Sequence, residues 1–401
     1  MQKIGLIPRL IIAIIVGIIV GFFFPQWVGN LLYTVSEIFG QLLMFVVPLI
    51  ILGFIIPGLA ELAQSPGKLL GATAGLAYLT TVAMGAIAFL VGMAVIPALA
   101  PELMVIDEEA GLSRYLEIEI QPIIGVMTAL VTAFVFGLGA HALRRRNSNS
   151  VLFNFMDEVR EVTRMVIRKL IIPFLPLYIA GIFANMAAEG VVFETLAVFG
   201  PLFVLVIALQ IGFLLVYFFI ASRVSPENRP LQSLRKMLPA YTTALGTVSS
   251  AATMPVTLQS AKTLNVEEDI PDFTVPLCAT IHLTGSTIAL VLSAVTVYVM
   301  QIGTPALTEF IPFILLLALV MIGAPGVPGG AVMAALGIMQ VTLGFTEAQL
   351  ALMIALYMGQ DPFGTACNVT GDGGIAIMIN KLAQRLKRKG GGAQAAQGEP
   401  A

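Results

Sequence analysis

Apolar segments long enough to cross a lipid bilayer occupy most of this 401-residue chain. A transmembrane helix needs about 20 mainly apolar residues, and eight segments meet this requirement. Only 11% of all residues are charged, whereas a soluble domain carries roughly 25%. The sequence therefore predicts an all-α polytopic membrane protein. The eight predicted transmembrane helices lie near 8–24, 38–60, 69–99, 122–143, 165–188, 195–221, 273–302 and 346–380.

Two further apolar segments, 231–262 and 308–344, are interrupted in the middle by Ser, Thr, Gly and Pro. Such interruptions leave backbone groups unpaired, and lipid tolerates them only where they are buried in protein or line a cavity. We interpret each segment as a re-entrant helical hairpin, with its tip at Ser249 and Ser250 or at 325–330. A pair of segments broken in this way is typical of the binding site of a secondary transporter.

The charged residues indicate how this arrangement is oriented. If both hairpins enter and leave the membrane on the same side, one side of the membrane carries the basic residues of 144–146, 223–236 and 381–389. The other side then carries the acidic residues of 102–119. Basic loops are usually cytoplasmic, so both termini are predicted to be cytoplasmic in a multi-pass protein of the cell membrane. Two segments, 100–121 and 145–164, are expected to be solvent-facing loops.

The last apolar segment contains two acids, Asp361 and Asp372, separated by about three helical turns. Thr365 and Asn368 fall on the same helical face. Because an ionisable residue within a membrane is costly, this polar stripe is expected to face a binding site. We expect one acid to bind a ligand amine and the other a hard cation. The alternative is a purely structural pair of acids.

Further candidates come from the breaks in the apolar segments. Around His282, the residues 280–286 interrupt a predicted helix, which would free carbonyl oxygens for a cation. His282 could carry a proton, although a lone histidine is more often a hydrogen-bonded packing residue than a ligand. Ser249 and Ser250 could present hydroxyl and N–H groups to a carboxylate at a helix start. The glycines of 325–330 would let the backbone approach a ligand closely.

These motifs resemble those of the dicarboxylate/amino acid:cation symporters, the family of the glutamate and aspartate transporters. The similarity rests on SSAATMPVTL at the first tip, ATIHLTGS at the helix break, GVPGG at the second tip and DPFGTACNVTGD in the last segment. It extends over nearly the whole chain. It implies a glutamate-transporter-like elevator fold with inverted repeats, assembled as a homotrimer.

The resemblance also implies a division into a static scaffold and a mobile transport domain. Scaffold helices 1 and 2 would occupy 1–66, and helix 3 of the transport domain 67–100. An extracellular loop and helices 4–6 would occupy 101–222, with helices 4 and 5 in the scaffold and helix 6 in the transport domain. The transport core of two hairpins and helices 7 and 8 would occupy 223–384, and a disordered cytoplasmic tail 385–401.

By position in these motifs, Asp361 corresponds to the acid that binds the substrate amino group, and Asp372 to a sodium-binding carboxylate. Tyr78 and Thr81 correspond to residues around another sodium ion. The substrate-binding residues implied in this way are Ser249, Ser250, Val327, Gly329, Asp361, Gly364, Thr365 and Asn368. The implied sodium ligands are Asn368, Asp372, His282, Tyr78, Thr81 and Thr284.

The chain departs from the family pattern at positions that affect specificity. Gly364 and Val248 stand where transporters of acidic substrates place an arginine. A second substrate carboxylate would be buried without a partner, at a cost of several kcal/mol, which favours a neutral amino acid. His282 and Thr284 replace the Asn and Asp of the family's NMDGT motif, so the sodium site that depends on this Asp is expected to be weakened.

The sequence thus predicts a sodium-coupled amino-acid symporter and not an enzyme. Its expected partners are a small-molecule substrate, membrane lipid and further copies of itself, and the net charge of −2 gives no support for a nucleic-acid partner. Two alternatives remain, a proton-coupled carrier of a small carboxylate or dicarboxylate, and a channel that uses the same fold. A hydrolase built on Ser249 or Ser250 with His282 is disfavoured, since the chain lacks GxSxG.

Overall fold

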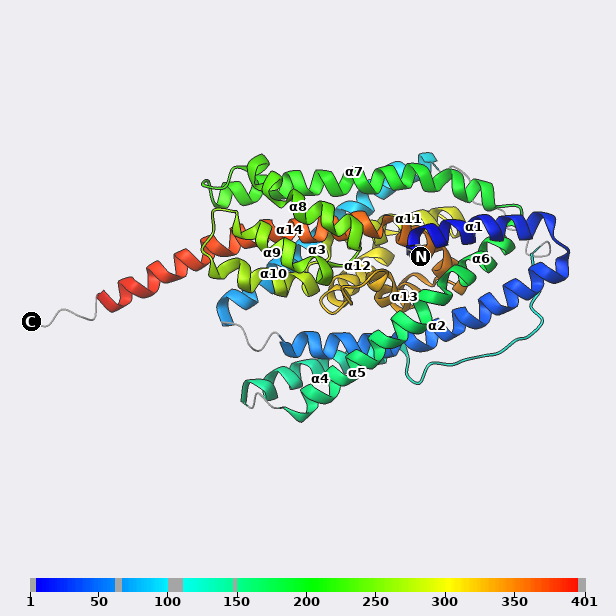
Figure 1. Ribbon diagram of the computed structural model, residues 1–401, viewed down its shortest axis with the longest axis horizontal. Coiled ribbons are helices and arrows are strands. Elements are labelled where there is room, and N and C mark those ends of the chain that lie inside the picture. Colours follow the sequence, from blue (N-terminus) through cyan, green and yellow to red (C-terminus); the bar gives the residue numbers. More distant parts are fainter. Residues whose placement is uncertain (1–4, 62–66, 100–110, 147–149, 396–401) are drawn as a thin grey trace, which may run out of the picture.

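The computed structural model describes residues 5–61, 67–99, 111–146 and 150–395 (Figure 1). All regular elements in these residues are helical, as predicted. The elements are α1 (Leu6–Phe23), α2 (Gln26–Glu61), α3 (Gly67–Leu99), α4 (Val126–Arg146), α5 (Val151–Val166), the π-helix η2 (Ile167–Ile171), α6 (Ile172–Ala188), α7 (Val192–Val224), α8 (Pro230–Thr247), α9 (Ser250–Lys262), α10 (Asp269–Ile281), α11 (Thr284–Gln301), α12 (Leu307–Met321), α13 (Gly330–Leu343) and α14 (Glu347–Ala395).

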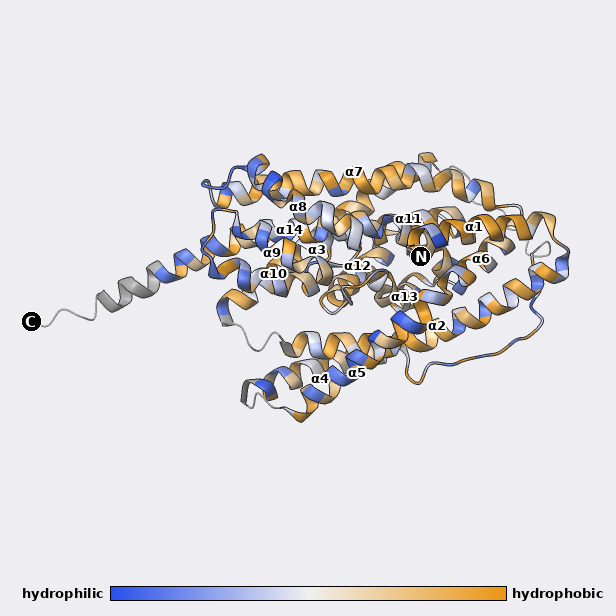
Figure 2. Ribbon diagram, in the orientation of Figure 1, coloured by the Kyte–Doolittle hydropathy of each residue, from blue (hydrophilic) through white to orange (hydrophobic). Residues whose placement is uncertain are grey.

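The described helices have the length and apolar character of a multi-pass membrane protein. Seven helical stretches of the described residues are long and apolar enough to cross a bilayer, when α5 to α6 and α10 to α11 are each counted as one stretch. Large apolar side chains face outward on several helices, among them Ile12 on α1, Leu138 on α4 and Val204 on α7. Soluble proteins rarely expose so much apolar surface, so these faces suit contact with lipid. Hydrophilic residues gather where α7 passes into α8 and where α14 leaves the bundle (Figure 2).

The helices form two packed groups. In the first, α1 packs on α6, and α2 packs on α4, α5 and α6. Close approach of α1 to α6 depends on glycine, since a Cβ at Gly17 would lie 2.3 Å from the carbonyl oxygen of Ala180. Small residues allow such helix contacts in membrane proteins. In the second group, α14 packs on α7, α8, α9, α10 and α11, and α3 packs on α11 and α12.

The predicted breaks occur where the sequence places them. Helices α8 and α9 meet at Val248 and Ser249, and Val248 adopts the left-handed conformation with φ 50°. Helices α12 and α13 are separated by 322–329, and α10 and α11 by His282 and Leu283. The predicted interruptions of 231–262 and 308–344 and the helix break within 280–286 are therefore confirmed.

Two predicted loops differ from the structure. The segment 145–164 is largely helical, because α5 begins at Val151 and continues through η2 into α6. This helix is strongly amphipathic and buries Phe153, Met156 and Thr163, so it packs on the bundle. For the loop 100–121, residues 100–110 lie outside the described part, and 111–121 form an extended segment along α2.

The prediction of a disordered tail over 385–401 is wrong for 385–395, because α14 continues to Ala395 (Figure 1). Three glycines at 390–392 disfavour helix, but residues 381–389 are all Lys, Leu, Ala, Gln or Arg, which favour it. They extend an existing helix and so avoid the cost of nucleation. Lys381 forms an ion pair with Glu227, and Lys387 forms one with Glu267. Residues 396–401 lie outside the described part.

Candidate functional site

The predicted polar stripe lies on one continuous helix, α14, in the centre of the second packed group. Asp361, Thr365, Asn368 and Asp372 are each at most 5% exposed. Their spacing of three to four residues places them on one side of the helix. Each of these polar groups therefore needs a partner within the protein or from a ligand.

Asp361 is surrounded by hydrogen-bond donors but lacks a cationic partner. Its Oδ2 atom accepts a bond of 2.7 Å from the backbone N–H of Gly329. Its Oδ1 atom accepts bonds from the hydroxyl groups of Tyr357 at 3.0 Å and Thr365 at 3.4 Å. Within the described ranges, no lysine, arginine or histidine pairs with this carboxylate. The arrangement leaves Asp361 able to bind an ammonium group.

The tips of the two broken segments meet over Asp361. Ser249 Oγ donates a hydrogen bond of 2.5 Å to the carbonyl oxygen of Gly326 and also caps the start of α9. Gly329 adopts φ 74°, and a Cβ there would lie 2.9 Å from the sulfur of Met358. Only glycine readily adopts this conformation at so close an approach. The close approach lets the Gly329 N–H reach α14.

A small cavity remains between these tips and α14. Its volume is 10 Å³, about the size that one water molecule requires. Ser250, Val327, Thr365 and Asn368 line it together with Asp361, so five of the eight predicted substrate residues meet there. Gly329 joins the group through its bond to Asp361. Gly364 lies beside the cavity, where a Cβ would be 3.4 Å from Ser286.

Asn368 connects the stripe to the break between α10 and α11. Its Oδ1 atom accepts hydrogen bonds from the backbone N–H groups of Gly285 at 2.7 Å and Ser286 at 3.3 Å. Its Nδ2 group donates to Ser286 Oγ at 2.9 Å. These bonds satisfy N–H groups that a helix start leaves unpaired. Gln210 of α7 donates to the Gly285 carbonyl oxygen at 2.9 Å and supports the same break.

Asp372 has a direct partner that the sequence did not indicate. Nδ1 of His282 lies 2.9 Å from Oδ1 of Asp372, and both side chains are at most 2% exposed. Gly371 permits this approach, because a Cβ there would lie 2.8 Å from His282 Cε1. The two residues are 90 positions apart in the sequence. Only the packing of α10 against α14 brings them together.

The remaining predicted sodium ligands lie on α3 and at the start of α11. The hydroxyl oxygens of Thr81 and Thr284 are 3.3 Å apart and buried. Tyr78 is half-buried about one turn earlier on α3. Hydroxyl oxygens are suitable ligands for a hard cation, but this group contains no carboxylate.

The site residues predicted from the sequence did not include Tyr357, Gln210 or Ser286, although Ser286 lies in the predicted helix break. Tyr357 bonds to Asp361 and Ser286 to Asn368, whereas Gln210 bonds to the carbonyl oxygen of Gly285 at the break. A signal existed for Tyr357, since it lies four residues before Asp361 and so continues the polar stripe. Gln210 is a lone amide in an otherwise apolar helix, and such a residue within a membrane segment usually has a specific partner.

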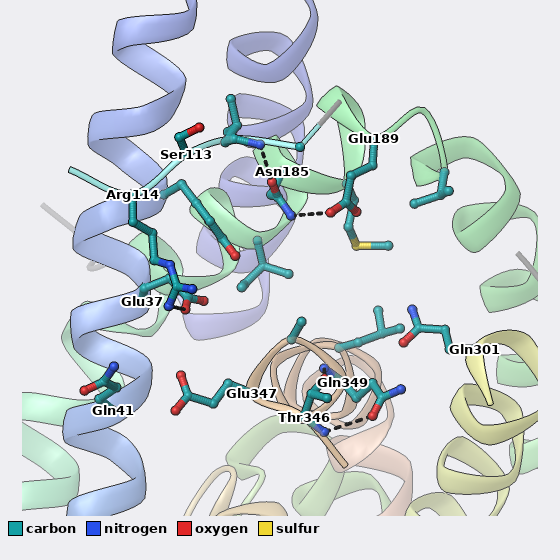
Figure 3. Close-up of a pocket in the computed structure, with 18 of the residues that line it drawn as sticks. Glu37, Gln41, Ser113, Arg114, Asn185, Glu189, Gln301, Thr346, Glu347 and Gln349 are labelled. Carbon is teal, nitrogen blue, oxygen red and sulfur yellow. Dashed lines mark hydrogen bonds and ion pairs between the residues drawn. The ribbon is translucent and has the colours of Figure 1, made fainter. Parts of the chain in front are cut away.

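A second, larger cavity lies between α2, α6 and the start of α14 (Figure 3). It has a volume of 880 Å³, and Glu37, Glu189, Glu347 and Arg114 project into it. Arg114 forms an ion pair of 3.4 Å with Glu37. Tyr178 of α6 donates a hydrogen bond of 3.3 Å to the carbonyl oxygen of Glu347, the first residue of α14. The predicted substrate and sodium residues do not line this cavity.

Comparison with known proteins identifies the family of this chain. Residues 6–382 match the model of the sodium:dicarboxylate symporter family. A serine/threonine transporter of Bifidobacterium adolescentis is 26% identical over 357 residues, covering 82% of this chain and 78% of that protein. Excitatory amino acid transporter 4 of Mus musculus is 26% identical over 274 residues, covering 65% of this chain and 46% of that protein. Both relatives are transporters and not enzymes. The chain belongs to the sodium:dicarboxylate symporter family.

Proposed function

We propose that the chain is a secondary active transporter that moves a neutral amino acid across the cell membrane together with sodium. Membership of the family supports cation-coupled transport of an amino acid. The proposal that the substrate is a neutral amino acid rests on the cavity at Asp361. It holds a buried carboxylate for an ammonium group, and in the described part of the chain no Lys, Arg or His side chain lines it.

The proposed substrate pose follows from these groups. The ammonium group binds Asp361, and the carboxylate binds the N–H groups and hydroxyls at the first tip together with Asn368. The substrate side chain extends toward Gly364. A second carboxylate there would lack a cationic partner, because none of the described residues that line the cavity is Lys, Arg or His.

We propose a topology of eight transmembrane helices and two re-entrant hairpins, α8–α9 and α12–α13, with both termini in the cytoplasm. The short helices on either side of each tip support this topology, because backbone that is not helical would be buried in protein. The basic residues after α7 and in α14 support the orientation.

We further propose an elevator mechanism in which α1, α2 and α4–α6 form a static scaffold within a homotrimer. The transport domain then comprises α3 and α7–α14. The two packed groups support this division. The 880 Å³ cavity lies between α2 and α6 of the proposed scaffold and the start of α14 of the proposed transport domain, at the boundary of these two groups.

We propose that sodium ions bind at two groups of oxygen atoms. One contains Asp372 and Asn368 with the carbonyl groups at the break, and the other contains Thr81, Thr284 and Tyr78. The first includes a carboxylate and fits a sodium ion better, since its charge offsets dehydration of the cation. The second offers hydroxyl oxygens alone.

The proposal is tested by uptake into proteoliposomes, with radiolabelled L-serine, L-alanine, L-aspartate and succinate supplied separately. Sodium and proton gradients are imposed one at a time. We expect sodium-driven accumulation of serine or alanine and poor uptake of aspartate and succinate. Accumulation of succinate driven by protons alone would favour the carboxylate carrier, and flux that never exceeds equilibrium would favour a channel.

The Gly364→Arg variant is expected to shift preference from serine and alanine toward aspartate. A guanidinium at this position supplies a bidentate partner for the side-chain carboxylate. Gly364→Ala is the matched control, since its Cβ would make only an ordinary contact of 3.4 Å with Ser286. Competition of each amino acid with labelled serine measures the shift. Tight aspartate binding by the unmodified protein would contradict the assigned role of Gly364.

The Thr284→Asp variant is expected to steepen the sodium dependence of serine uptake. The added carboxylate faces Thr81, which lies 3.3 Å from the Thr284 hydroxyl, and so supplies the missing charge for a second cation. Thr284→Asn serves as the uncharged control of similar size. The Hill slope of uptake against sodium concentration is the measurement. An equal slope in the unmodified protein and the Asp variant would show that no cation site was missing.

A further inference from the structure

The two oxygens of the Asp361 carboxylate are held by different parts of the protein. Oδ1 accepts hydrogen bonds from two hydroxyl groups of its own helix, those of Tyr357 and Thr365. Oδ2 accepts a hydrogen bond from the N–H of Gly329 at the second tip. A carboxylate offers about four lone-pair positions, so these three donors leave little capacity unused. A substrate ammonium group must therefore bind Oδ2 alongside the N–H of Gly329 or displace that N–H.

Tyr357 makes the stronger of the two bonds to Oδ1. Its hydroxyl oxygen lies 3.0 Å from Oδ1, against 3.4 Å for Thr365. The ring of Tyr357 is 0% exposed and lines the substrate cavity. Packing on all sides fixes the ring, so the hydroxyl group is a preorganised donor.

The helix is locally weakened at this position. Pro362 lies directly after Asp361, and proline has no N–H to donate to the carbonyl group of Met358. The Tyr357–Asp361 bond crosses the same turn of α14. The Tyr357–Asp361 bond therefore stabilises the orientation of the Asp361 carboxylate at a turn that has one backbone hydrogen bond fewer than a regular helix.

We propose that Tyr357 is a positioning residue of the substrate site, which holds Oδ1 of Asp361 so that Oδ2 faces both the second tip and the substrate ammonium group. This inference rests on the proposed function. Without the hydroxyl group, the carboxylate can rotate and must be reoriented each time a substrate binds. Binding is weakened, while movement of the loaded transport domain is unaffected.

The test is sodium-driven uptake of radiolabelled L-serine and L-alanine by the Tyr357→Phe protein in proteoliposomes. We expect KM to rise about tenfold, which corresponds to about 1.4 kcal/mol, with the maximal rate and the half-saturating sodium concentration unchanged. Thr365→Val should raise KM in the same direction but less, because its bond is longer. The thermal unfolding midpoint of each purified variant is measured in parallel.

Tyr298→Phe is the matched control. Tyr298 of α11 donates a bond of 2.9 Å to the Glu309 carboxylate, which is also a tyrosine–carboxylate bond but is exposed and lies outside the substrate cavity. This control should leave KM unchanged. An unchanged KM in Tyr357→Phe would overturn the proposal, and so would a lower unfolding midpoint or maximal rate with KM unaltered. If the unmodified protein accumulates no amino acid at all, the proposed function fails instead.

Discussion

Asp361→Asn is expected to reduce sodium-driven uptake of serine and alanine by on the order of 100-fold, because Asp361 is the only charged side chain among the described residues that line the cavity. An ammonium ion buried beside a neutral amide loses its charge-assisted hydrogen bond and remains desolvated. In the unmodified protein, the N–H of Gly329 and the hydroxyl of Tyr357 both donate to the carboxylate. The NH2 group of asparagine is also a donor, so it would face one of these two donors without forming a hydrogen bond. Initial rates in proteoliposomes measure the loss.

Asp272→Asn provides the control for this prediction. Asp272 lies on α10 in the same packed group, but it forms a surface ion pair of 2.7 Å with Lys262. Such exposed pairs contribute about 0–1 kcal/mol, so this variant should transport normally. If Asp361→Asn retained normal uptake at equal protein levels, an ammonium-bearing substrate could not be held by this acid.

Asp372→Asn is expected to raise the sodium concentration for half-maximal uptake at least about tenfold, since a buried cation loses the carboxylate that compensates its dehydration. The order of preference among amino acids should stay the same, because Asp372 lies about three turns from Asp361 and does not line the substrate cavity. Uptake of serine is therefore measured against sodium concentration, with competition by alanine and aspartate as the readout of specificity.

The same Asp272→Asn protein is the control, because it removes a carboxylate that lies outside both proposed sodium sites. An unaltered sodium dependence in Asp372→Asn would remove this acid from the sodium site. A change of amino-acid preference without a change in sodium dependence would instead assign Asp372 to substrate binding. Either result is distinguishable from the loss of all uptake that Asp361→Asn should cause.

Local chemistry made several features of this fold predictable. The tips at Ser249 and at 325–330 and the break at His282 were predictable because Ser, Thr, Gly and Pro are clustered there within apolar segments, and such clusters favour turns. The stripe from Asp361 to Asp372 follows from helical periodicity alone. The helix at 151–166 was missed because its charged residues suggested a loop, although their periodicity favours helix. The helical part of the tail was missed because its composition is of low complexity, with three glycines at 390–392 that disfavour helix.

Sequence alone determined that this chain is an all-helical membrane protein with interrupted segments and two buried acids, because hydropathy and helix breaking depend on residues close together in the chain. Tertiary structure decided which groups these acids contact. Asp372 meets His282 across 90 positions, and the Asp361 carboxylate meets Gly329 across 32. Such pairs depend on how distant helices pack against one another, and a pattern of local periodicity contains no information about that packing.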